Sequence, residues 1–430
     1  MKYVTNSHPR ALGVMKAALL GGTALALAGG TGAPASAASM VDRGIERRVS
    51  DLEAEVRLLK NRVKALEDRK LAVPDKIVVS GNSRVKVTLY GQVNRAVRFS
   101  FQSRDTEVHH VDNDLSSSRI GILAQGRLFP DMTIGAVTEV EWQENPRSAT
   151  DDNNDGNETL RARKVELWFT HATMGSLYLG HGDTAAKDIE FLDLSGTDIV
   201  ASSAGCGDDG LRFGPGAANV GASGLPFASA CLTLDGSRQN RIMYVSPSIA
   251  GFAVKVSHGE QDQFEAAIVY EDSPFGLKDI KVVAGFGYTY APTKGASIPA
   301  LGAGSFSQYA GSASILHVPT GLSLTFAGGY RTFLGTNAVG VANPHYWYVK
   351  GGYQSKFWSM GTTYLSLDFG SYNQMAPGDI HGWSIGGAVV QAVDTAATDL
   401  YAGLRYQDAK TAGAGLNGAM TLLIGARIKF

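Results

Sequence analysis

The sequence predicts an all-β chain: a sixteen-stranded antiparallel transmembrane β-barrel, preceded by a short α-helical coiled coil. From residue 85 onward, apolar and polar residues alternate in segments of about ten to thirteen residues, the length that a tilted strand needs to cross a bilayer. The connections between these segments alternate between tight turns and long polar loops. With 52 Gly and 2 Cys in 430 residues, the composition suits a β-rich chain with many turns.

Residues 1–37 predict a secretory signal peptide. Lys2, Arg10 and Lys16 flank or enter the apolar run ALLGGTALALAGG, and an A-x-A cleavage pattern follows at Ala35–Ala37. A folded N-terminal helix is the alternative, but the glycines of the run disfavour it. Cleavage would move the formal net charge from −1 to about −4. We therefore expect an exported protein.

Residues 40–70 predict a coiled coil, because apolar residues recur in alternating steps of three and four. Val occupies the a positions and Leu the d positions, at Val49, Leu52, Val56, Leu59, Val63 and Leu66. β-Branched a residues with Leu at d favour two strands. However, RVSDLE and RVKALE resemble the Arg-hydrophobic-x-x-hydrophobic-Glu pattern of short trimeric coiled coils, so we expect a trimer. Residues 71–84, with the helix-ending Pro74, form a linker.

The expected barrel occupies residues 85–430. Its sixteen strands are expected at 85–102, 115–128, 131–144, 160–171, 175–182, 239–247, 251–259, 263–272, 279–291, 305–317, 321–333, 345–356, 360–373, 380–392, 398–408 and 418–430. Tight turns such as 318–321 alternate with long loops such as 103–114 and 145–159, as in transmembrane β-barrels. A soluble β-sandwich is the alternative, but its strands are usually only about five or six residues long.

The longest break between strands runs from residue 183 to residue 236. Loops of this length are uncommon unless they are functional or disordered, and a solvent-exposed surface loop is the plainer interpretation. The loop contains both cysteines, Cys206 and Cys231. An oxidising compartment favours a disulfide between them, two free thiols being the alternative. A metal site is not expected, since no pair of histidines lies nearby.

Several motifs carry a family resemblance across residues 85–430. VTLYGQVN (87–94), SSSRIGILAQGRL (116–128), MGSLYLGHGDT (174–184) and SRQNRIMYVSPSIAGF (237–252) occur in this order, and the chain ends in Phe430. Together they resemble the trimeric general-diffusion porins of Gram-negative outer membranes. The motif that usually ends Gly-Arg-Gln reads Gly-His-Gly here, so no pore arginine is assigned to His181. The N-terminal coil is similar to that of a subset of these porins, some associated with dicarboxylate uptake.

The resemblance implies that the loop at 183–236 folds into the barrel and narrows the channel. Its acidic residues are Asp188, Glu190, Asp193 and Asp198, and a basic wall is expected opposite them, formed by Arg98, Arg119, Arg163, Arg238 and Arg241. Because side chains alternate between the two faces of a strand, Arg98, Arg119, Arg238 and Arg427 are expected to point inward. The direction of Arg163 and Arg241 stays undetermined. Local pairing at the rim is the alternative, since a lipid-facing arginine costs a few kcal/mol at the bilayer centre. Arg95 is expected on the same outward face as Val93 and Val97, where a charge is out of place, which suggests a subunit interface or a bulge.

Residues 151–156 imitate the start of a calcium-binding EF-hand loop. Asp151, Asn153 and Asp155 precede a glycine, but the twelfth position is Ala162 and no flanking helices are evident. The sequence therefore favours a solvated outer loop over a calcium site. We expect no cofactor.

The expected function is a water-filled outer-membrane channel for passive diffusion of small hydrophilic solutes and ions. The resemblance implies a homotrimer in contact with lipid and lipopolysaccharide, with Phe430 presented to the outer-membrane assembly machinery and the coil in the periplasm. Alternatives are an envelope tether and a more selective dicarboxylate or anion porin. An enzyme is not expected, because His171, His181 and His258 are scattered and form no Ser-His-Asp arrangement. Nucleic acid is excluded as a partner by the near-zero net charge.

Overall fold

A computed structural model describes residues 82–102, 105–151, 158–206, 210–213, 225–292, 305–334, 343–375, 380–411, 414–415 and 418–430. The expected signal peptide, the coiled coil and the linker up to residue 81 lie outside these ranges. Among the described residues, no helix is both long enough and apolar enough to span a membrane.

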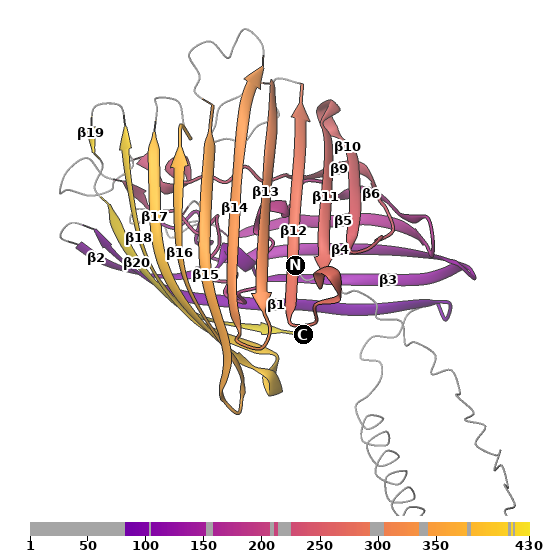
Figure 1. Cartoon of the computed structure of the whole chain (residues 1–430), viewed down its shortest axis with the longest axis horizontal. Helices are drawn as coiled ribbons and strands as arrows, with labels where there is room; N and C mark the ends of the chain where they lie inside the picture. The colour runs from indigo at the N-terminus through magenta and orange to yellow at the C-terminus, as the bar shows by residue number, and fades with distance from the viewer. Residues whose placement is uncertain are drawn as a thin grey trace, which may run out of the picture. The chain divides into compact units, whose positions relative to one another are not determined.

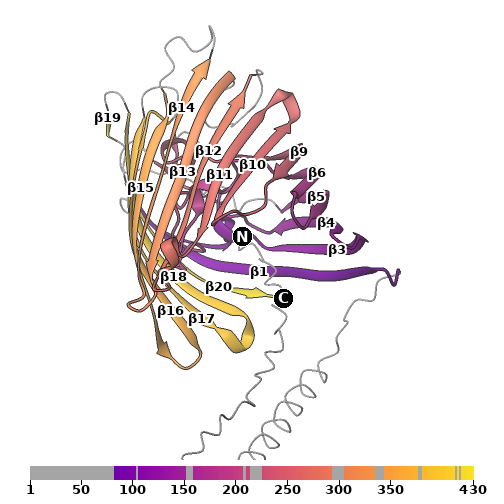
Figure 2. The same ribbon diagram turned by 45° about the vertical axis from the view of Figure 1, so that its right-hand side comes forward.

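The described residues form one closed antiparallel barrel. Its strands are β1 Val85–Gln102, β2 Asp105–Asp112, β3 Arg119–Phe129, β4 Met132–Gln143, β5 Thr159–His171, β6 Gly175–Asp183, β9 Arg238–Val245, β10 Phe252–Gly259, β11 Phe264–Asp272, β12 Ile280–Ala291, β13 Ser305–His317, β14 Leu322–Leu334, β15 His345–Trp358, β16 Gly361–Asn373, β17 His381–Val393, β18 Thr398–Thr411, β19 Ala414–Gly415 and β20 Ala419–Lys429. Each barrel strand pairs with its neighbours along the chain, and β20 returns to pair with β1 from Gln92–Lys429 to Gln102–Ala419 (Figures 1 and 2).

The prediction of sixteen barrel strands is confirmed for the described part of the chain. The sheet contains eighteen strands, but β2 and β3 share one position in the barrel, and the short β19 only extends the hairpin that leads from β18 into β20. β3 pairs with the first half of β1 and β2 with the second half. The 3₁₀ turn η1, Asp114–Ser116, interrupts the strand between them.

One expected loop is therefore wrong. The sequence predicts a long polar loop at residues 103–114. In the structure, Asp105–Asp112 forms β2, which pairs with β1 from Gln102 to Arg95. The polar segment DTEVHHVD lacks the apolar alternation that marks the other strands. Here the partner strand, rather than local hydrophobicity, determines the structure, because the long β1 offers unpaired backbone groups beyond β3.

The two faces of the barrel differ as expected for a membrane protein. On the outside, apolar side chains such as Ile122, Phe326 and Leu367 are exposed, at 51%, 54% and 73%. On the inside, small polar residues such as Ser314 and Thr325 are buried against the chain that enters the barrel. An exposed apolar exterior is stable only in lipid. The alternation predicted for the final strand is confirmed, with Ile424 and Ile428 exposed and Leu423 buried.

The chain between β6 and β9 enters the barrel and supplies its hydrophobic core. It contains η2 Ile189–Phe191, the paired β7 Arg212–Phe213 and β8 Leu225–Pro226, and the short α2 Phe227–Ala230. Other 3₁₀ turns are η3 Glu260–Asp262, η4 Pro274–Gly276 and η6 Asp394–Ala396. One buried cluster joins Phe227 and Leu234 to the wall residues Tyr346 and Tyr372. A second joins the loop residues Ile199 and Val200 to the wall residues Val390, Tyr401 and Leu423.

Candidate pore constriction

The chain between β6 and β9, called the inner loop below (184–237), is attached to successive strands of one side of the barrel. The Ala185 amide donates to Ser257 Oγ on β10 at 2.9 Å, and the Ala186 amide donates to Glu265 Oε2 on β11 at 2.8 Å. Farther along, Leu192 donates its amide to Ser312 Oγ on β13 at 3.1 Å, and Leu194 donates to Ser314 Oγ on the same strand at 3.0 Å. The inner loop thus follows the barrel wall from β10 onward.

The attachment continues on β14, β15 and β16. Asp193 accepts a hydrogen bond from Thr325 Oγ1 on β14 at 2.7 Å and forms an ion pair with Lys350 Nζ on β15 at 2.7 Å. Thr197 Oγ1 donates to Ser366 Oγ on β16 at 2.8 Å. Inward-facing glycines allow this close approach: a Cβ on Gly352 would lie 2.7 Å from Ser195 Cβ, and one on Gly403 would lie 2.5 Å from a methyl of Val200.

Glu190 lies between the inner loop and the wall, at 2% exposure. Its Oε2 accepts hydrogen bonds from the Tyr346 hydroxyl on β15 and from the Leu234 amide, the latter at 3.2 Å. Burial and the neighbouring Asp235 raise the pKa of Glu190 to about 8. A carboxyl group in this position is therefore protonated at neutral pH and acts as a neutral hydrogen-bonding group.

Lys187 joins the two ends of the inner loop. Its ammonium forms ion pairs with Asp188, at 2.7 Å, and with Asp235, and Asp235 Oδ1 also accepts the Asp188 amide at 2.7 Å. Asp188 has a left-handed backbone (φ 63°) and a side chain that is 37% exposed. Asp198 is exposed as well. Of the four acidic residues expected at the constriction, these two reach solvent, whereas Glu190 and Asp193 attach the inner loop to the wall.

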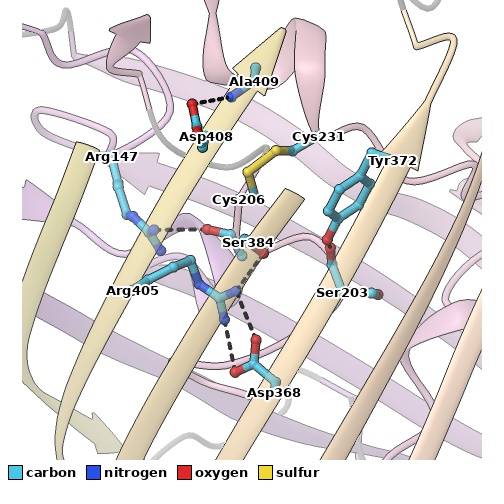
Figure 3. Close-up of a disulfide and its surroundings, with 11 residues drawn as sticks. Arg147, Ser203, Cys206, Cys231, Asp368, Tyr372, Ser384, Arg405, Asp408 and Ala409 are labelled. Carbon is cyan, nitrogen blue, oxygen red and sulfur yellow. Dashed lines mark hydrogen bonds and ion pairs between the residues drawn. A yellow bond between two sulfur atoms is a disulfide. The ribbon is translucent and has the colours of Figure 1, made fainter. Parts of the chain in front are cut away.

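The predicted disulfide between Cys206 and Cys231 is confirmed, and both cysteines are fully buried (Figure 3). Beside it, the Tyr372 hydroxyl on β16 donates to the Ser203 carbonyl at 2.6 Å. Arg405 on β18 forms an ion pair with Asp368 on β16 at 2.8 Å and donates to Ser384 Oγ on β17 at 3.0 Å (Figure 3). The disulfide therefore lies against a wall that is itself cross-linked between strands.

A second segment, residues 144–151, joins the inner loop near the disulfide. Arg147 Nη2 donates to the Gly205 carbonyl at 3.1 Å, and the Gly210 amide donates to the Arg147 carbonyl at 2.9 Å. Arg98 on β1 supports this segment: it is fully buried and donates to the carbonyl groups of Arg147 and Thr150, at 3.3 and 2.8 Å. Arg98 points inward as predicted, but it is covered by protein and does not reach solvent.

The opposite side of the barrel, β3 to β5, carries a cluster of charged side chains. Arg163 on β5 binds Glu139 on β4 at 2.7 Å and also Glu141, and Arg161 binds Glu141 at 2.8 Å. Arg119 on β3 donates to the Ser117 carbonyl at 3.0 Å and to Ser116 Oγ at 3.4 Å. Within the described residues, Arg119 forms no ion pair. None of the hydrogen bonds that attach the inner loop ends on these three strands, within the described ranges.

A β-bulge explains why parity did not determine the facing of Arg163. Glu139 pairs with Lys164, whereas the next residue, Val140, pairs with Ala162, so Arg163 is an extra residue in β5. The bulge keeps Arg161, Arg163 and Lys164 near the inward-facing acids of β4. The sequence contains no turn residue or glycine at this position that would have indicated a bulge.

Arg238 and Arg241 lie where the inner loop leaves and rejoins the wall. Arg238 at the start of β9 binds Asp183 at the end of β6, at 2.6 Å, and Lys164 binds the same carboxylate at 2.6 Å. Arg241 is buried: it binds Glu166 on β5 and donates to the Gly180 and Asp183 carbonyls, at 3.1 and 2.9 Å. This arginine cross-links three strands.

The remaining expected residues have clear positions. Arg427 on β20 points inward and binds Asp399 on β18 at 2.7 Å and Ser116 Oγ at 2.8 Å. Arg95 is exposed on the outer face and donates to the Glu144 carbonyl, with no bulge in the pairing of β1. The backbone of Phe430 pairs with Gly91, and the residue is 59% exposed.

Asp151 is described but Asn153 and Asp155 are not, so the calcium hypothesis lies outside the described residues.

Sequence reasoning missed the wall residues that hold the inner loop, above all Lys350, Tyr346 and Tyr372. Each lies in a predicted barrel strand, and nothing in the neighbouring sequence distinguishes a buried lysine from a lysine at the rim. The available signal was the parity of Lys350 with Tyr346 and Tyr348, which places all three on one face of β15.

Comparison with known proteins places this architecture in a family. A family model described as Gram-negative porin matches residues 23–412. Among solved structures, the anion-selective porin from Comamonas acidovorans has a TM-score of 0.54 at 16% identity, covering 80% of this chain and 100% of that one. A loop L8 deletion mutant of OmpT, an outer membrane protein of Vibrio cholerae, has a TM-score of 0.52 at 15% identity, covering 81% and 100%. The outer membrane channel DcaP of Acinetobacter baumannii has a TM-score of 0.50 at 11% identity, covering 82% and 99%.

At these identities the similar structures show the fold, and the family model carries the assignment. A search among curated proteins found no match for the chain. The family match covers most of the chain, the described part is a closed sixteen-stranded barrel, and its exterior is apolar. The chain belongs to the Gram-negative porins, and it is an outer-membrane β-barrel that forms a passive channel.

Proposed function

We propose that small hydrophilic solutes and ions pass between the inner loop and the charged wall on β3, β4 and β5. The observation that carries this proposal is that no described hydrogen bond attaches the inner loop to β3, β4 or β5. Its described hydrogen bonds to strands reach β10, β11 and β13 to β16, and others reach Asn113 and Arg147 in the connecting segments. Its apolar residues pack against β17, β18, β20, β1 and β2. The side chains of β3 to β5 therefore face the exposed part of the inner loop across the barrel interior.

In this proposal, Arg119 and Arg163 supply the basic side of the constriction, and Asp188 and Asp198 supply the acidic side. Charges of opposite sign on facing walls create a transverse field that orients dipolar solutes. Glu139 and Glu141 hold Arg163 by charge-assisted hydrogen bonds, which fix the position of its guanidinium. Arg119, which has hydroxyl and carbonyl partners, contributes the least compensated charge to this wall.

The reversal potential across a planar bilayer in a salt gradient tests these assignments. Replacing Arg119 with Ala should shift the reversal potential toward cation preference, because a positive charge leaves the wall. The matched control is Arg241→Lys, which keeps the charge of a buried arginine that binds Glu166. An unchanged reversal potential in Arg119→Ala, from channels of normal conductance, would show that the path of ions avoids β3.

We further propose that three copies of the chain assemble in the outer membrane, with the coil of residues 40–70 in the periplasm and Phe430 presented to the assembly machinery. The apolar exterior that continues across β20, β1 and β3 to β5, including Ile424, Val93, Ile120 and Leu167, suits both lipid and a second copy. Family membership also favours a channel over an enzyme. The exposed ring of Phe430 supports its role as a recognition element.

A further inference from the structure

Lys350 occupies an unusual place for a lysine in a barrel strand. It lies in the middle of β15, points inward and is 1% exposed. Its ammonium forms an ion pair with Asp193 at 2.7 Å and donates to the Ala201 carbonyl at 2.8 Å and to Thr197 Oγ1 at 3.5 Å. All three partners belong to the inner loop, so a single wall residue holds two points of that loop that are eight positions apart.

The partner of Lys350 is equally enclosed. The Asp193 side chain is 6% exposed, and its other contacts are the hydroxyl groups of Thr325, at 2.7 Å, and Ser195, at 2.6 Å, together with the Ser195 amide. Although burial raises the pKa of Asp193, the Lys350 ammonium and these hydrogen bonds outweigh it and hold the pKa below its usual value. Neither charge of the pair lies at a surface where it could attract or repel a passing ion.

Between the two attached points, the chain carries the exposed Asp198. Thr197 is fixed to Ser366 on β16, and the glycines at positions 352 and 403 let the backbone lie close to the wall on both sides. The distance between Asp198 and the opposite wall therefore depends on how firmly residues 193–201 are held. Among the contacts that hold residues 193–201, the ion pair between Lys350 and Asp193 is the charged one. Removing either partner would leave the other as a buried charge without compensation.

We propose that Lys350 is a positioning residue that fixes the inner loop against β15 and thereby determines the cross-section of the pore, without lining the pore itself. This inference rests on the proposed function. It assigns to a buried wall lysine the role of holding residues 193–201 in place, and it predicts that the channel's steadiness, rather than its charge preference, depends on this side chain.

Single-channel recording of Lys350→Met tests the proposal. The expected result is a several-fold increase in open-channel current noise and variable conductance levels, because Asp193 loses its partner and residues 193–201 move. The reversal potential should stay at the wild-type value. Asp193→Asn should give the same kind of noise to a smaller extent, since Asn keeps the side-chain volume and one oxygen to accept from the Ser195 amide and the Thr325 hydroxyl. Lys350→Arg should keep the current quiet.

The double substitution Lys350→Met with Asp193→Leu provides a second reading. Because both buried charges are removed together, the noise should fall back toward the wild-type level. The matched control is Lys356→Met, which removes an exposed lysine from the same strand and should change neither noise nor conductance. Gel migration with and without heating verifies that each variant is a folded barrel.

Two results would overturn the assignment. A quiet current with a reversal potential shifted toward cations in Lys350→Met would make Lys350 a pore-lining cation. A Lys350→Met channel identical to wild type in noise and conductance would show that the ion pair does not hold the loop. If Lys350→Met fails to fold, the Asp193→Asn recording decides by the same criteria. A failure of the wild-type protein to conduct would instead refute the proposed channel function.

Discussion

Gly352 shows how a single residue determines how closely the inner loop lies against the wall. It faces inward on β15, where a Cβ would lie 2.4 Å from Ser323 Oγ and 2.7 Å from Ser195 Cβ. Its neighbour Gly351 faces outward, and a Cβ there would meet nothing within 4 Å. The two adjacent glycines therefore have different reasons to be small, and only Gly352 is required by packing.

Substituting Gly352 with Ala should push Ser195 away from the wall and destabilise the protein by about 1–3 kcal/mol, the usual cost of overpacking. The measurement is the midpoint of thermal unfolding in detergent, with single-channel conductance as a second readout. Gly351→Ala is the matched control and should leave both unchanged. Equal effects of the two substitutions would show that packing between Ser195 and the wall does not account for the difference.

Glu190 should make the stability of the inner loop depend on pH. Its pKa is raised to about 8, so the folded state binds its proton more tightly than the unfolded chain does. The resulting stabilisation is fully present below the unfolded-state pKa of about 4.3 and is lost as the pH rises through about 8. Asp235, Lys187, Tyr346 and Arg331 also interact electrostatically with Glu190 and set the size of the effect.

The test compares Glu190→Gln with wild type, since Gln imitates the neutral acid. Between about pH 5 and about pH 8, wild-type thermal stability should fall relative to the variant by up to about 1.4 kcal/mol for each pH unit, and the difference should level off above the folded-state pKa of about 8. Because Asp235 lies beside Glu190 and also has a raised pKa, of about 7, the difference between the two proteins reports the titration of this carboxyl pair. Parallel pH profiles for the two proteins would contradict a protonated Glu190 in the folded state.

At the scale of single residues, the sequence predicts the direction and pairing of a side chain better than its burial and its contacts. Arg119 and Arg427 point inward as parity indicated, and the cysteines pair. Glu190 and Asp193 look like exposed loop acids because nothing local in the sequence reveals that the inner loop presses them against the wall. Their environment depends on Tyr346 and Lys350, 156 and 157 positions away in the chain.

At the scale of elements, alternation locates the strands well because each barrel strand has one face in lipid and one inside. It fails at β2, whose polar residues are held by pairing with β1, and at the bulge of β5, which changes the facing of Arg163. The inner loop was recognisable from its length. The path of the inner loop along β10 to β18 was not recognisable from the sequence, because it depends on glycines and hydroxyl groups distributed over many strands.

The coiled coil of residues 40–70 makes a prediction at this scale. Replacing Leu52 and Leu59 with Asp places charges in the d positions of the seam and should prevent the helices from associating. Individual barrels should remain folded, while the assembled oligomer should form more slowly and dissociate at a lower temperature. Chemical cross-linking and gel migration at increasing temperature measure both. A variant that assembles as fast as the wild type and is equally heat-stable would show that the coil has a different function, such as contact with the cell wall.

For the whole molecule, the structure combines a rigid barrel with an inner loop that is fixed at many points. Hydrogen bonds to β10, β11 and β13 to β16 and two buried apolar clusters hold the loop against the wall, and a disulfide cross-links the loop itself. A loop held in this way should not move on the time scale of ion passage. The channel is therefore expected to conduct steadily and without a requirement for voltage.

Single-channel conductance of the purified wild-type protein in planar bilayers tests the central claim most directly. The account predicts stepwise current increases that appear in groups of three, vary linearly with voltage and stay open at low voltage. Gel migration with and without heating confirms that the sample contains folded barrels. Folded protein that inserts into bilayers but carries no current would contradict a water-filled channel beside the inner loop.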